Sequence, residues 1–507
     1  MSAEEEPPKG LNLKVCHSVA VGGAPTDGPV LRSALSPHTL HERPFGTNFQ
    51  NIYSIFEAAA ARRPSRPCFG TRFRADGSVG PFSWQTYEEV AARVQAFAAG
   101  LWQLHVVPAS ADGKRFVGLY MKNSPEWMVA AEACYRTGVC IVPMYDTLGP
   151  DTVGYIQRQT GMGTAICSAN ELPTLLKACP FADVIVAGPV APALLAKCRA
   201  ARIPVRTFSE VEAAGQAALP ILASLPQPGP KDLALLCYTS GTTGDPKGVC
   251  LTHGGVTMAA SYAAGLEVNE TDRYLSYLPL AHIFESLMEH GIWCRGGSVG
   301  YFGGNVKELL DDVAELRPTI FCGVPRVFGR VYDKAMAGIA AKGGVVRALF
   351  NLAMRLELDA LKTGEHTALQ FLFGPVRAAL GGHCRLIVSG AAPLPSHVQD
   401  FLRATMGCPV VQGYGMTENC AQGTIAIADD WRGGHVGPPM PTVEVKLVDV
   451  PEMGYYSYND PPAGEVCQRG VPTFKCYHKN PEATAETIDA QGWQHTGDIG
   501  RWNADGT

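Results

Sequence analysis

The segment with the clearest chemical potential is an eleven-residue loop that begins at Tyr238 and ends at Gly248. It reads Tyr-Thr-Ser-Gly-Thr-Thr-Gly-Asp-Pro-Lys-Gly and follows an apolar run, Leu233–Tyr238, that predicts a strand. Glycines let backbone N–H groups turn together toward an anion, hydroxyls add donors, and Lys247 supplies a positive charge. The nucleotide-triphosphatase pattern G-x-x-x-x-G-K-[ST] does not fit, so the segment predicts another type of phosphate-binding loop.

Four further segments combine polar and aromatic residues with small ones. They are Leu278–Glu285, which contains His282, then Ser389–Leu394, Gln412–Glu418 and Thr496–Asp498. Taken singly, each has an ordinary structural interpretation: a lone histidine or tyrosine is commonly structural or core, and a lone carboxylate commonly faces solvent. Their order and their residue types together favour a single composite site.

The elements that must position these segments follow a regular alternation. Short, largely apolar runs at Arg115–Tyr120, Cys140–Tyr145, Thr164–Cys167 and Asp183–Ala187 predict strands, with helical segments between them. Helix starts are marked by Thr86-x-x-Glu89, which forms a capping-box pattern, and by Ser124-Pro125-Glu126. Strand–helix–strand repetition implies a parallel sheet covered on both faces.

The alternation changes at three places along the chain. Residues 213–232 have the composition of a linker, and residues 331–380 predict a long helical insertion. Between these two segments the alternation continues, and Asn305-x-x-Glu308 predicts a helix start with an apolar stripe from Val306 to Leu316. From about residue 440, short strands joined by Pro/Gly turns predict a small antiparallel sub-domain. The predicted organisation is an arm over 1–48, α/β sub-domains over 49–230 and 231–440, and a β sub-domain over 441–507.

Composition narrows the class of protein. The chain has 507 residues, of which 46% are hydrophobic and 18% charged, so it can bury a large core. A net charge of −5 argues against nucleic-acid binding, for which a basic excess is typical. The 16 cysteines form no zinc-like cluster, and the acidic N-terminus lacks a secretory pattern. We therefore expect an intracellular protein in a reducing compartment, cytosolic or peripheral on the endoplasmic reticulum or peroxisome, and any membrane contact to be peripheral.

The five segments, in this order, resemble the motifs of the acyl-adenylate-forming superfamily of acyl-CoA synthetases, luciferases and peptide-synthetase adenylation domains. Three other stretches, Phe82–Tyr87, Arg317–Phe328 and Gly492–His495, resemble the long-chain fatty acyl-CoA synthetase branch. The resemblance covers about residues 45–507. It implies an α/β fold of two stacked parallel-sheet αβ sub-domains with a smaller antiparallel β sub-domain. It also implies an ATP-dependent fatty acid–CoA ligase that forms acyl-AMP and then transfers the acyl group to CoA.

The same resemblance assigns roles to single residues. Thr239 and Glu418 would hold Mg²⁺, and Lys247 would contact the β- and γ-phosphates. His282 would orient the acyl carboxylate or gate the site, without acting as a base. Tyr414 would face the adenine ring, and Asp498 would bind the ribose hydroxyls. The full implied nucleotide-binding set is Thr239, Ser240, Gly241, Thr242, Thr243, Gly244, Lys247, Gly390, Ala391, Gln412, Gly413, Tyr414, Gly415, Met416, Thr417 and Asp498.

Two matters stay open at this level. An acyl tunnel needs apolar walls, and the candidates are Phe284, Tyr301, Phe302, Phe321, Val324 and Phe328. Each of them fits an ordinary core equally well. The apolar segment Leu369–Pro375 fits either a membrane-surface contact or a buried broken helix. Alternatives to a long-chain substrate are an aryl or shorter acid, or an inactive module that binds ATP and fatty acid.

The end of the chain carries a further expectation. In the family, a hinge motif and a C-terminal domain follow the point reached at Thr507. That domain carries a lysine that contacts the forming acyl phosphate, and it rotates to admit CoA. The resemblance therefore predicts nucleotide and fatty-acid binding by these 507 residues and leaves that lysine outside them.

Overall fold

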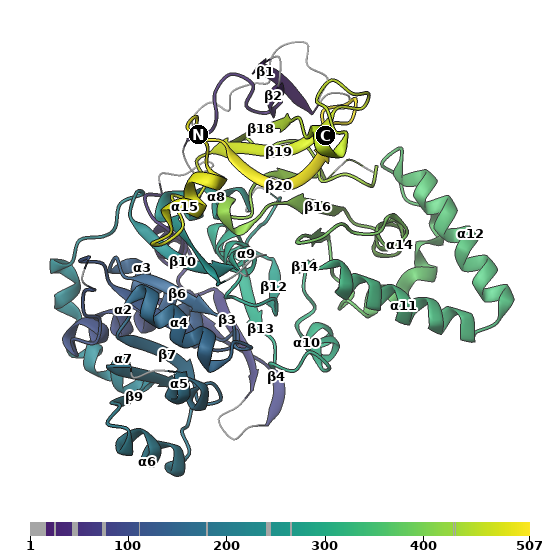
Figure 1. Ribbon diagram of the computed structural model, residues 1–507. Coiled ribbons are helices and arrows are strands. Elements are labelled where there is room, and N and C mark those ends of the chain that lie inside the picture. Colours follow the sequence, from purple (N-terminus) through teal and green to yellow (C-terminus); the bar gives the residue numbers. More distant parts are fainter. Residues whose placement is uncertain are drawn as a thin grey trace.

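The computed structural model describes residues 17–24, 27–42, 49–73, 78–110, 112–178, 181–239, 245–263, 266–428, 430 and 432–507. These residues form three β-sheets with helices packed between and around them (Figure 1). The mixed α/β architecture, with two largely parallel sheets and one antiparallel sheet, confirms the predicted fold class.

The first sheet has seven strands. Its order is β11 (Lys247–Thr252), β10 (Leu233–Thr239), β6 (Cys140–Met144), β5 (Phe116–Tyr120), β7 (Thr164–Ser168), β8 (Asp183–Ala187) and β9 (Val205–Thr207). All neighbours are parallel except β10 and β11, which form a hairpin with Thr239 opposite Lys247. The strands β5 and β6 are buried along their whole length, which explains their continuous apolar sequences.

The second sheet has eight strands. Its order is β17 (Thr424–Ile425), β16 (Val410–Tyr414), β15 (Leu386–Ser389), β14 (Ile320–Gly323), β12 (Arg273–Ser276), β13 (Ser298–Tyr301), β3 (Pro67–Phe73) and β4 (Val79–Thr86). The pairs β16–β17 and β3–β4 at its two edges are antiparallel, and the pairs between them are parallel. The carboxyl ends of β15 and β16 carry two of the predicted motifs to the same edge.

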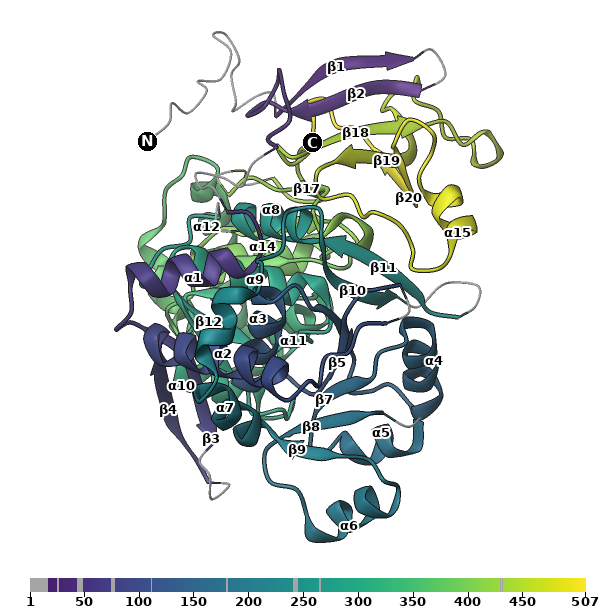
Figure 2. The same ribbon diagram turned by 90° about the vertical axis from the view of Figure 1, so that its left-hand side faces the viewer.

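The third sheet is antiparallel, with the order β1 (Ser18–Ala24), β2 (Asp27–Ser33), β18 (Val443–Val448), β19 (Ala463–Gly470) and β20 (Gln494–Arg501). Figure 2 shows this sheet above the other two, with β1 and β2 beside β18. Residues 18–33, which were expected to form an arm, thus supply two of its strands. Likewise β3–β4 and β10–β11 join sheets whose other strands lie on the far side of the predicted boundary at 230. The sheets follow long-range pairing, which local sequence does not encode.

Several local predictions hold at the level of side chains. Thr86 and Glu89 form the predicted capping box at the start of α2 (Tyr87–Gln103). Ser124 caps α3 (Pro125–Arg136) by accepting from the Trp127 N–H at 3.2 Å. The remaining helices of the first half are α1 (Tyr53–Arg62), α4 (Pro150–Thr160), α5 (Leu172–Ala178), α6 (Pro192–Ala200), α7 (Phe208–Gln216) and the 3₁₀ turn η1 (Leu219–Ser224). The last two occupy much of the segment predicted as a linker.

One helix begins later than predicted. The helix α10 spans Leu309–Leu316, and Val306, expected on its buried stripe, is 60% exposed. The Asn305 side chain accepts from the Lys307 N–H at 3.1 Å, a local turn that competes with helix formation. The predicted insertion over 331–380 is helical, with α11 (Pro325–Ala341), α12 (Gly344–Leu361), η2 (Ala368–Phe373) and α13 (Gly374–Ala378). In the segment Leu369–Pro375, Phe373 is buried whereas Phe371 is 72% exposed.

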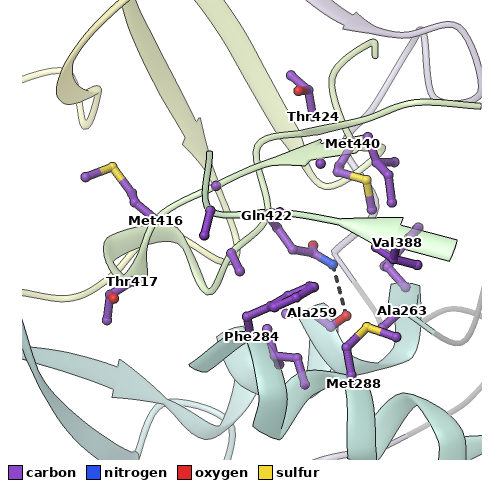
Figure 3. A pocket seen from close by; sticks show the side chains of 18 of the residues that line it. Ala259, Ala263, Phe284, Met288, Val388, Met416, Thr417, Gln422, Thr424 and Met440 are labelled. Carbon is purple, nitrogen blue, oxygen red and sulfur yellow. Dashed lines mark hydrogen bonds between the residues drawn. The ribbon is translucent and has the colours of Figure 1, made fainter. Parts of the chain in front are cut away.

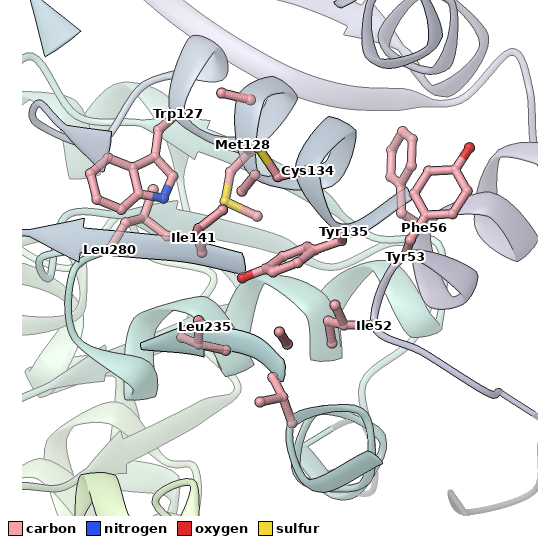
Figure 4. Close-up of a cluster of buried hydrophobic side chains, with 14 of the residues drawn as sticks. Ile52, Tyr53, Phe56, Trp127, Met128, Cys134, Tyr135, Ile141, Leu235 and Leu280 are labelled. Carbon is pink, nitrogen blue, oxygen red and sulfur yellow. The ribbon is translucent and has the colours of Figure 1, made fainter. Parts of the chain in front are cut away.

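The core joins the two α/β sheets. Figure 4 shows side chains from α1, α3, β6 and β10 gathered in one buried cluster. Leu280, from the segment that contains His282, belongs to the same cluster. The helices α8 (His253–Ala263), α9 (Ile283–Cys294) and α14 (Ser396–Met406), with α15 (Pro481–Thr487) and the 3₁₀ turns η3 (Thr417–Asn419) and η4 (Pro451–Met453), complete the fold. The segment Leu278–Glu285 is therefore fixed to the core through Leu280.

Candidate active site

A pocket of about 380 Å³ opens at the carboxyl ends of β10, β15 and β16 and extends between α8 and α9 (Figure 3). Its polar lining comes from strand ends, and its apolar lining comes mainly from the two helices. Its lining residues are Thr239, Ala259, Tyr262, Ala263, Leu266, His282, Phe284, Leu287, Met288, Val388, Ser389, Gly390, Ala391, Gly413, Gly415, Met416, Thr417, Glu418, Ala421, Gln422, Thr424, Ile425 and Met440.

Many of the sequence-predicted site residues therefore meet in one cavity. Those that line it are Thr239, His282, Phe284, Gly390, Ala391, Gly413, Gly415, Met416, Thr417 and Glu418. Lys247, Gln412, Tyr414 and Asp498 do not line it. Lys247 lies over the Tyr477 ring, Gln412 bonds to Leu394, and Tyr414 bonds to Asp498. The predicted phosphate-loop residues Ser240, Gly241, Thr242, Thr243 and Gly244 lie outside the described residues.

Glu418 and Lys247 are linked through Tyr477, a residue that the motifs did not single out. The Tyr477 hydroxyl donates to Glu418 Oε1 at 2.8 Å, and Lys247 Nζ lies 5.3 Å from the centroid of the Tyr477 ring. Tyr477 thus positions a carboxylate and stabilises a nearby ammonium group through its ring face. Because Tyr477 follows Glu418 by 59 residues, no local spacing could have revealed the pair.

Tyr414 and Asp498 are joined directly across two sheets. Tyr414 ends β16 and donates from its hydroxyl to Asp498 Oδ2, on β20, at 2.7 Å. Burial raises the pKa of the Tyr414 phenol, so it remains a hydrogen-bond donor at neutral pH. The third sheet is thereby tied to the edge of the second beside the pocket.

The turn that presents Glu418 is fixed by its neighbours. Asn419 is fully buried, and its side-chain oxygen accepts from the N–H groups of Met416 at 2.8 Å and Gln422 at 3.1 Å. A Cβ at Gly415 would lie 2.4 Å from the carbonyl carbon of Ala421, so glycine is needed where the chain doubles back. Glu418 therefore stands on a rigid turn.

The Ser389–Leu394 segment is held against the second sheet by a buried amide. Gln412 accepts from the Leu394 N–H at 2.9 Å, so its side chain supports the segment instead of entering the pocket. Ala391 has φ +69°, a left-handed conformation that costs a non-glycine residue free energy. A Cβ at Gly390 would meet the Phe284 ring at 3.6 Å, which places that ring over the glycine backbone.

His282 caps α9 at the mouth of the apolar half. Its Nδ1 accepts from the Phe284 N–H at 3.2 Å, which leaves the proton of the neutral ring on Nε2. Burial lowers the pKa of His282, so the neutral form dominates at physiological pH. The segment before it is held by Asn123, whose side chain donates to Leu278 O at 2.7 Å and accepts from the Leu280 N–H at 2.9 Å.

The apolar half of the pocket was only partly predicted. Its walls are Ala259, Tyr262 and Ala263 on α8 and Leu287 and Met288 on α9, together with the predicted Phe284. Of the other aromatic and aliphatic residues chosen from the sequence, none lines the pocket: Tyr301, Phe302, Phe321, Val324 and Phe328. Phe321 and Phe328 pack edge to face in a neighbouring core, with ring centroids 6.1 Å apart.

The face of α9 turned away from the pocket carries buried ionisable groups. Tyr301 donates to Glu289 Oε2 at 3.0 Å, Tyr274 donates to Glu285 at 2.6 Å, and His290 Nε2 lies 2.7 Å from Glu132. Burial raises the pKa of Glu289 to about 7, against hydrogen bonds from Ser276 and Tyr301 that lower it. The helix α9, which forms one wall of the apolar half, is thus anchored through carboxyl groups whose pKa values burial raises.

Comparisons with known proteins identify the family to which the chain belongs. The model of the AMP-binding enzyme family matches residues 56–478. The chain is 40% identical to Long chain acyl-CoA synthetase 7, peroxisomal, of Arabidopsis thaliana, over 93% of this chain and 68% of that protein. It is 38% identical to Long-chain-fatty-acid–CoA ligase 6 of Homo sapiens, over 90% of this chain and 66% of that protein. The chain therefore spans about two thirds of the length of these relatives.

Solved structures share the fold at lower identity. The A domain of a carboxylic acid reductase from Segniliparus rugosus, in complex with AMP and a co-purified carboxylic acid, superposes with a TM-score of 0.69 at 22% identity, covering 90% of this chain and 73% of that one. The N-terminal domain of FACL13 from Mycobacterium tuberculosis gives a TM-score of 0.63 at 22% identity, covering 90% and 98%. The chain belongs to the AMP-binding enzyme family and, by its curated relatives, to the long-chain acyl-CoA synthetases.

Proposed function

We propose that this chain is the nucleotide- and acyl-binding part of an ATP-dependent long-chain fatty acid–CoA ligase. The acid's carboxylate attacks the α-phosphorus of ATP, which forms acyl-AMP and releases pyrophosphate. The sulfur of CoA then attacks the acyl carbonyl, its proton is lost, and AMP leaves. The observation that carries this proposal is the continuity of one pocket from the strand-end motifs to the apolar faces of α8 and α9.

The nucleotide half suits a polyphosphate with a divalent cation. The Thr239 hydroxyl and the Glu418 carboxylate line the same cavity, and oxygen donors of this kind suit Mg²⁺. With Oε1 of Glu418 held by Tyr477, Oε2 is the oxygen through which it would bind the ion. When bound, Mg²⁺ neutralises phosphate charge and so lets a carboxylate approach. Lys247, beside Tyr477, would add a second positive charge.

The base and sugar would be held by the remaining motif residues. Gly390 and Ala391 present backbone with little side-chain bulk, which suits a flat adenine ring. The Tyr414 hydroxyl already engages Asp498, so a bound ribose would share this carboxylate with the tyrosine. We retain Gln412, Gly413, Gly415, Met416 and Thr417 as proposed nucleotide-binding residues.

His282 suits orientation of the acid better than base catalysis. Its ring is neutral and presents the Nε2 proton, so it would donate to a carboxylate or phosphate oxygen. A carboxylic acid is already ionised at neutral pH and needs no base. The acyl chain would leave this point along the walls formed by Phe284, Leu287 and Met288. Tyr301, Phe321, Val324 and Phe328 remain predicted tunnel residues beyond that pocket.

Partners and compartment follow from the same assignment. The substrates are a long-chain fatty acid, ATP and CoA. No helix in the described ranges combines the length and apolarity needed to cross a bilayer. Two relatives from Arabidopsis thaliana are named as peroxisomal proteins. We propose a reducing intracellular compartment for this protein, either the cytosol or the surface of the endoplasmic reticulum or peroxisome.

Acid-dependent exchange between ATP and labelled pyrophosphate tests the proposal. Palmitate or oleate should support exchange with the 507-residue chain, and thioester formation should be measured with a chain extended by the C-terminal part of a relative. Exchange with a coumarate-type acid but not with palmitate or oleate would reassign the substrate. Binding of ATP and oleate without exchange in either chain would instead identify an inactive binding module.

A further inference from the structure

Two cysteines, Cys250 and Cys476, lie opposite each other on paired segments of backbone. Cys250 is buried on β11, and a single antiparallel β-bridge between Val249 and Tyr477 brings the two segments into register. The Cys250 N–H donates to the Cys476 carbonyl at 3.0 Å, and the Lys475 N–H donates to the Cys250 carbonyl at 3.1 Å. Residues opposite each other in such pairs have Cα atoms about 4.5–5.5 Å apart, a spacing that a disulfide bond can span. The two thiols also share a hydrogen bond, so their side chains face each other.

Cys476 combines access to solvent with thiolate character. Of the 14 cysteines in the described residues, 11 are buried, and Cys476 is one of the three that are partly exposed. The hydrogen bond from the Cys250 thiol lowers the pKa of Cys476 against burial, which raises it, and the ammonium groups of Lys475 and Lys114 lower it further. Because the thiolate is the reactive form of a cysteine, Cys476 is the nucleophile of the pair.

A second pair of contacting cysteines differs in this respect. Cys384 and Cys408 are both partly exposed, and a hydrogen bond between them raises the pKa of Cys408. Cys384 Sγ donates to the Leu386 carbonyl at 3.4 Å, so it too keeps its proton. A protonated thiol is a poor nucleophile. Cys408 is therefore a matched comparison for Cys476, since it is partly exposed and has a cysteine partner but lacks thiolate character.

The cysteine pair adjoins a residue of the proposed nucleotide site. Tyr477, which follows Cys476, donates to Glu418 Oε1 at 2.8 Å, and the Phe474 N–H donates to the Glu418 carbonyl at 2.6 Å. The segment that carries Cys476 thus holds Glu418 at two points. An S–S bond is about 2.05 Å long, shorter than a hydrogen-bonded separation, so closing it draws this segment toward β11. The Tyr477 hydroxyl then shifts relative to the carboxylate that it positions.

We propose that Cys250 and Cys476 form a site of reversible oxidation by hydrogen peroxide, and that the resulting disulfide weakens the binding of Mg-ATP. The Cys476 thiolate attacks one oxygen of the peroxide, an S–O bond forms as the O–O bond breaks, and the released hydroxide takes up a proton to give water. The Cys250 sulfur then attacks the sulfenic acid, an S–S bond forms as the S–O bond breaks, and the hydroxyl leaves as water with the Cys250 proton.

One peroxide is thus reduced to two waters while two thiols are oxidised to a disulfide. Thiol–disulfide exchange with the thiols of a reducing compartment reverses the step, which makes the disulfide a transient state. The oxidation itself does not depend on catalytic activity, whereas its effect on Mg-ATP rests on the proposed function.

Peptide mass spectrometry tests the oxidation site. The 507-residue chain, treated with hydrogen peroxide and then alkylated, should yield a cross-linked peptide that contains Cys250 and Cys476, and dithiothreitol should remove the cross-link. Cys476→Ser should abolish it, and Cys250→Ala should leave Cys476 as a sulfenic acid that dimedone traps. The matched control Cys408→Ser should form the cross-link as the unaltered chain does. Absence of the cross-link in the unaltered chain, or a cross-link from Cys476 to the buried Cys140 in its place, would overturn the proposal.

Titration with Mg-ATP tests the effect of the disulfide. The oxidised chain should bind Mg-ATP about fivefold more weakly than the reduced chain, as expected for a displaced hydrogen bond to Glu418, and dithiothreitol should restore the affinity. Cys476→Ser, with a melting temperature that confirms folding, should bind equally well with and without peroxide. Equal affinities of the oxidised and reduced chains, with the cross-link complete by mass, would overturn the coupling. A reduced chain that does not bind Mg-ATP would contradict the proposed function instead, while the cross-linked peptide decides the oxidation site in either case.

Discussion

The two halves of the pocket are built by different means. One half, which we call the nucleotide half after its proposed ligand, consists of strand ends and turns whose polar atoms are fixed by hydrogen bonds, as for Glu418 on the turn organised by Asn419. The other, which we call the acyl half after its proposed ligand, consists mainly of helix faces whose alanine, leucine and methionine side chains define only shape. Polar geometry demands particular residue types, whereas an apolar wall accepts any side chain of suitable volume. The motif residues of the first half are therefore visible in sequence, whereas Phe284 is the one wall residue of the second that the sequence predicted.

The largest expected effect tests where the acyl half ends. Phe328 is fully buried and packs on Phe321, so Phe328→Ala should lower the free energy of unfolding by about 3–5 kcal/mol by leaving a cavity. Chemical denaturation measures this loss. If Phe328 is core only, the relative rates with octanoate, palmitate and oleate should not change. A shift toward longer acids in the folded variant would instead extend the tunnel to this residue.

The nucleotide half should respond in activity while its stability is little changed. Glu418→Gln keeps an oxygen that can accept from Tyr477 but removes the negative charge, so exchange between ATP and pyrophosphate should fall about a hundredfold or more. The loss should be partly offset at high Mg²⁺ concentration if the carboxylate holds the ion. Glu452→Gln, on an exposed turn, is the matched control and should behave as the unaltered chain. Normal exchange in Glu418→Gln would remove this residue from the site.

What the sequence could predict follows the same division. The strand Val443–Val448 and the capping box at Thr86 appear at the predicted residues because their signals are local. The joining of β10–β11 to the first sheet, and of β3–β4 to the second, depends on pairing between distant segments. The predicted boundaries divide the chain into consecutive segments. They could therefore not assign a hairpin from one segment to a sheet whose other strands come from another.

The same limit applies to the site. Thr239, His282 and Glu418 were found through motifs whose spacing the chemistry constrains, and they line one cavity. Tyr477 and Asn123 contact the motifs from far along the chain, and a single tyrosine or asparagine carries no local signal. The walls Ala263 and Met288 have the composition of any buried helix. Only packing in three dimensions distinguishes a tunnel wall from the core.

A pH dependence tests the anchoring of the acyl wall. Because burial raises the pKa of Glu289 from 4.5 to about 7, the folded chain keeps a proton that the unfolded chain releases between these values. The free energy of unfolding should therefore fall as pH rises from 4.5 to 7, and the penalty is complete above 7. Glu289→Gln stays neutral and should exceed the unaltered chain in stability by up to about 3 kcal/mol at alkaline pH.

Glu285, His290 and Glu132 face the same cluster and also titrate, so the comparison must be made as a difference between variants at each pH. Denaturation curves at several pH values give this difference. An advantage of Glu289→Gln that did not shrink toward acidic pH would show that Glu289 is ionised in the folded state.

Narrowing the acyl half should have a smaller and more selective effect. Ala263 lies at the end of α8 and lines the cavity, and Leu at this position adds apolar volume where a chain would pass (Figure 3). Rates with palmitate should fall about tenfold relative to octanoate, while the affinity for Mg-ATP stays the same. An equal loss with both acids would mean that the α8 wall does not contact the distal part of the chain.

The smallest expected effect concerns the residue that joins the two charged groups of the nucleotide half. Tyr477→Phe removes the 2.8 Å hydrogen bond to Glu418 but keeps the ring beside Lys247, so it should raise the KM for Mg-ATP about fivefold, equivalent to ~1 kcal/mol. Tyr477→Leu removes both contacts and should be worse. Equal effects of the two variants would assign the whole contribution of Tyr477 to its hydroxyl. A loss in Tyr477→Phe as large as in Glu418→Gln would mean that the carboxylate works only in the orientation this hydroxyl imposes, because the charge itself is still present.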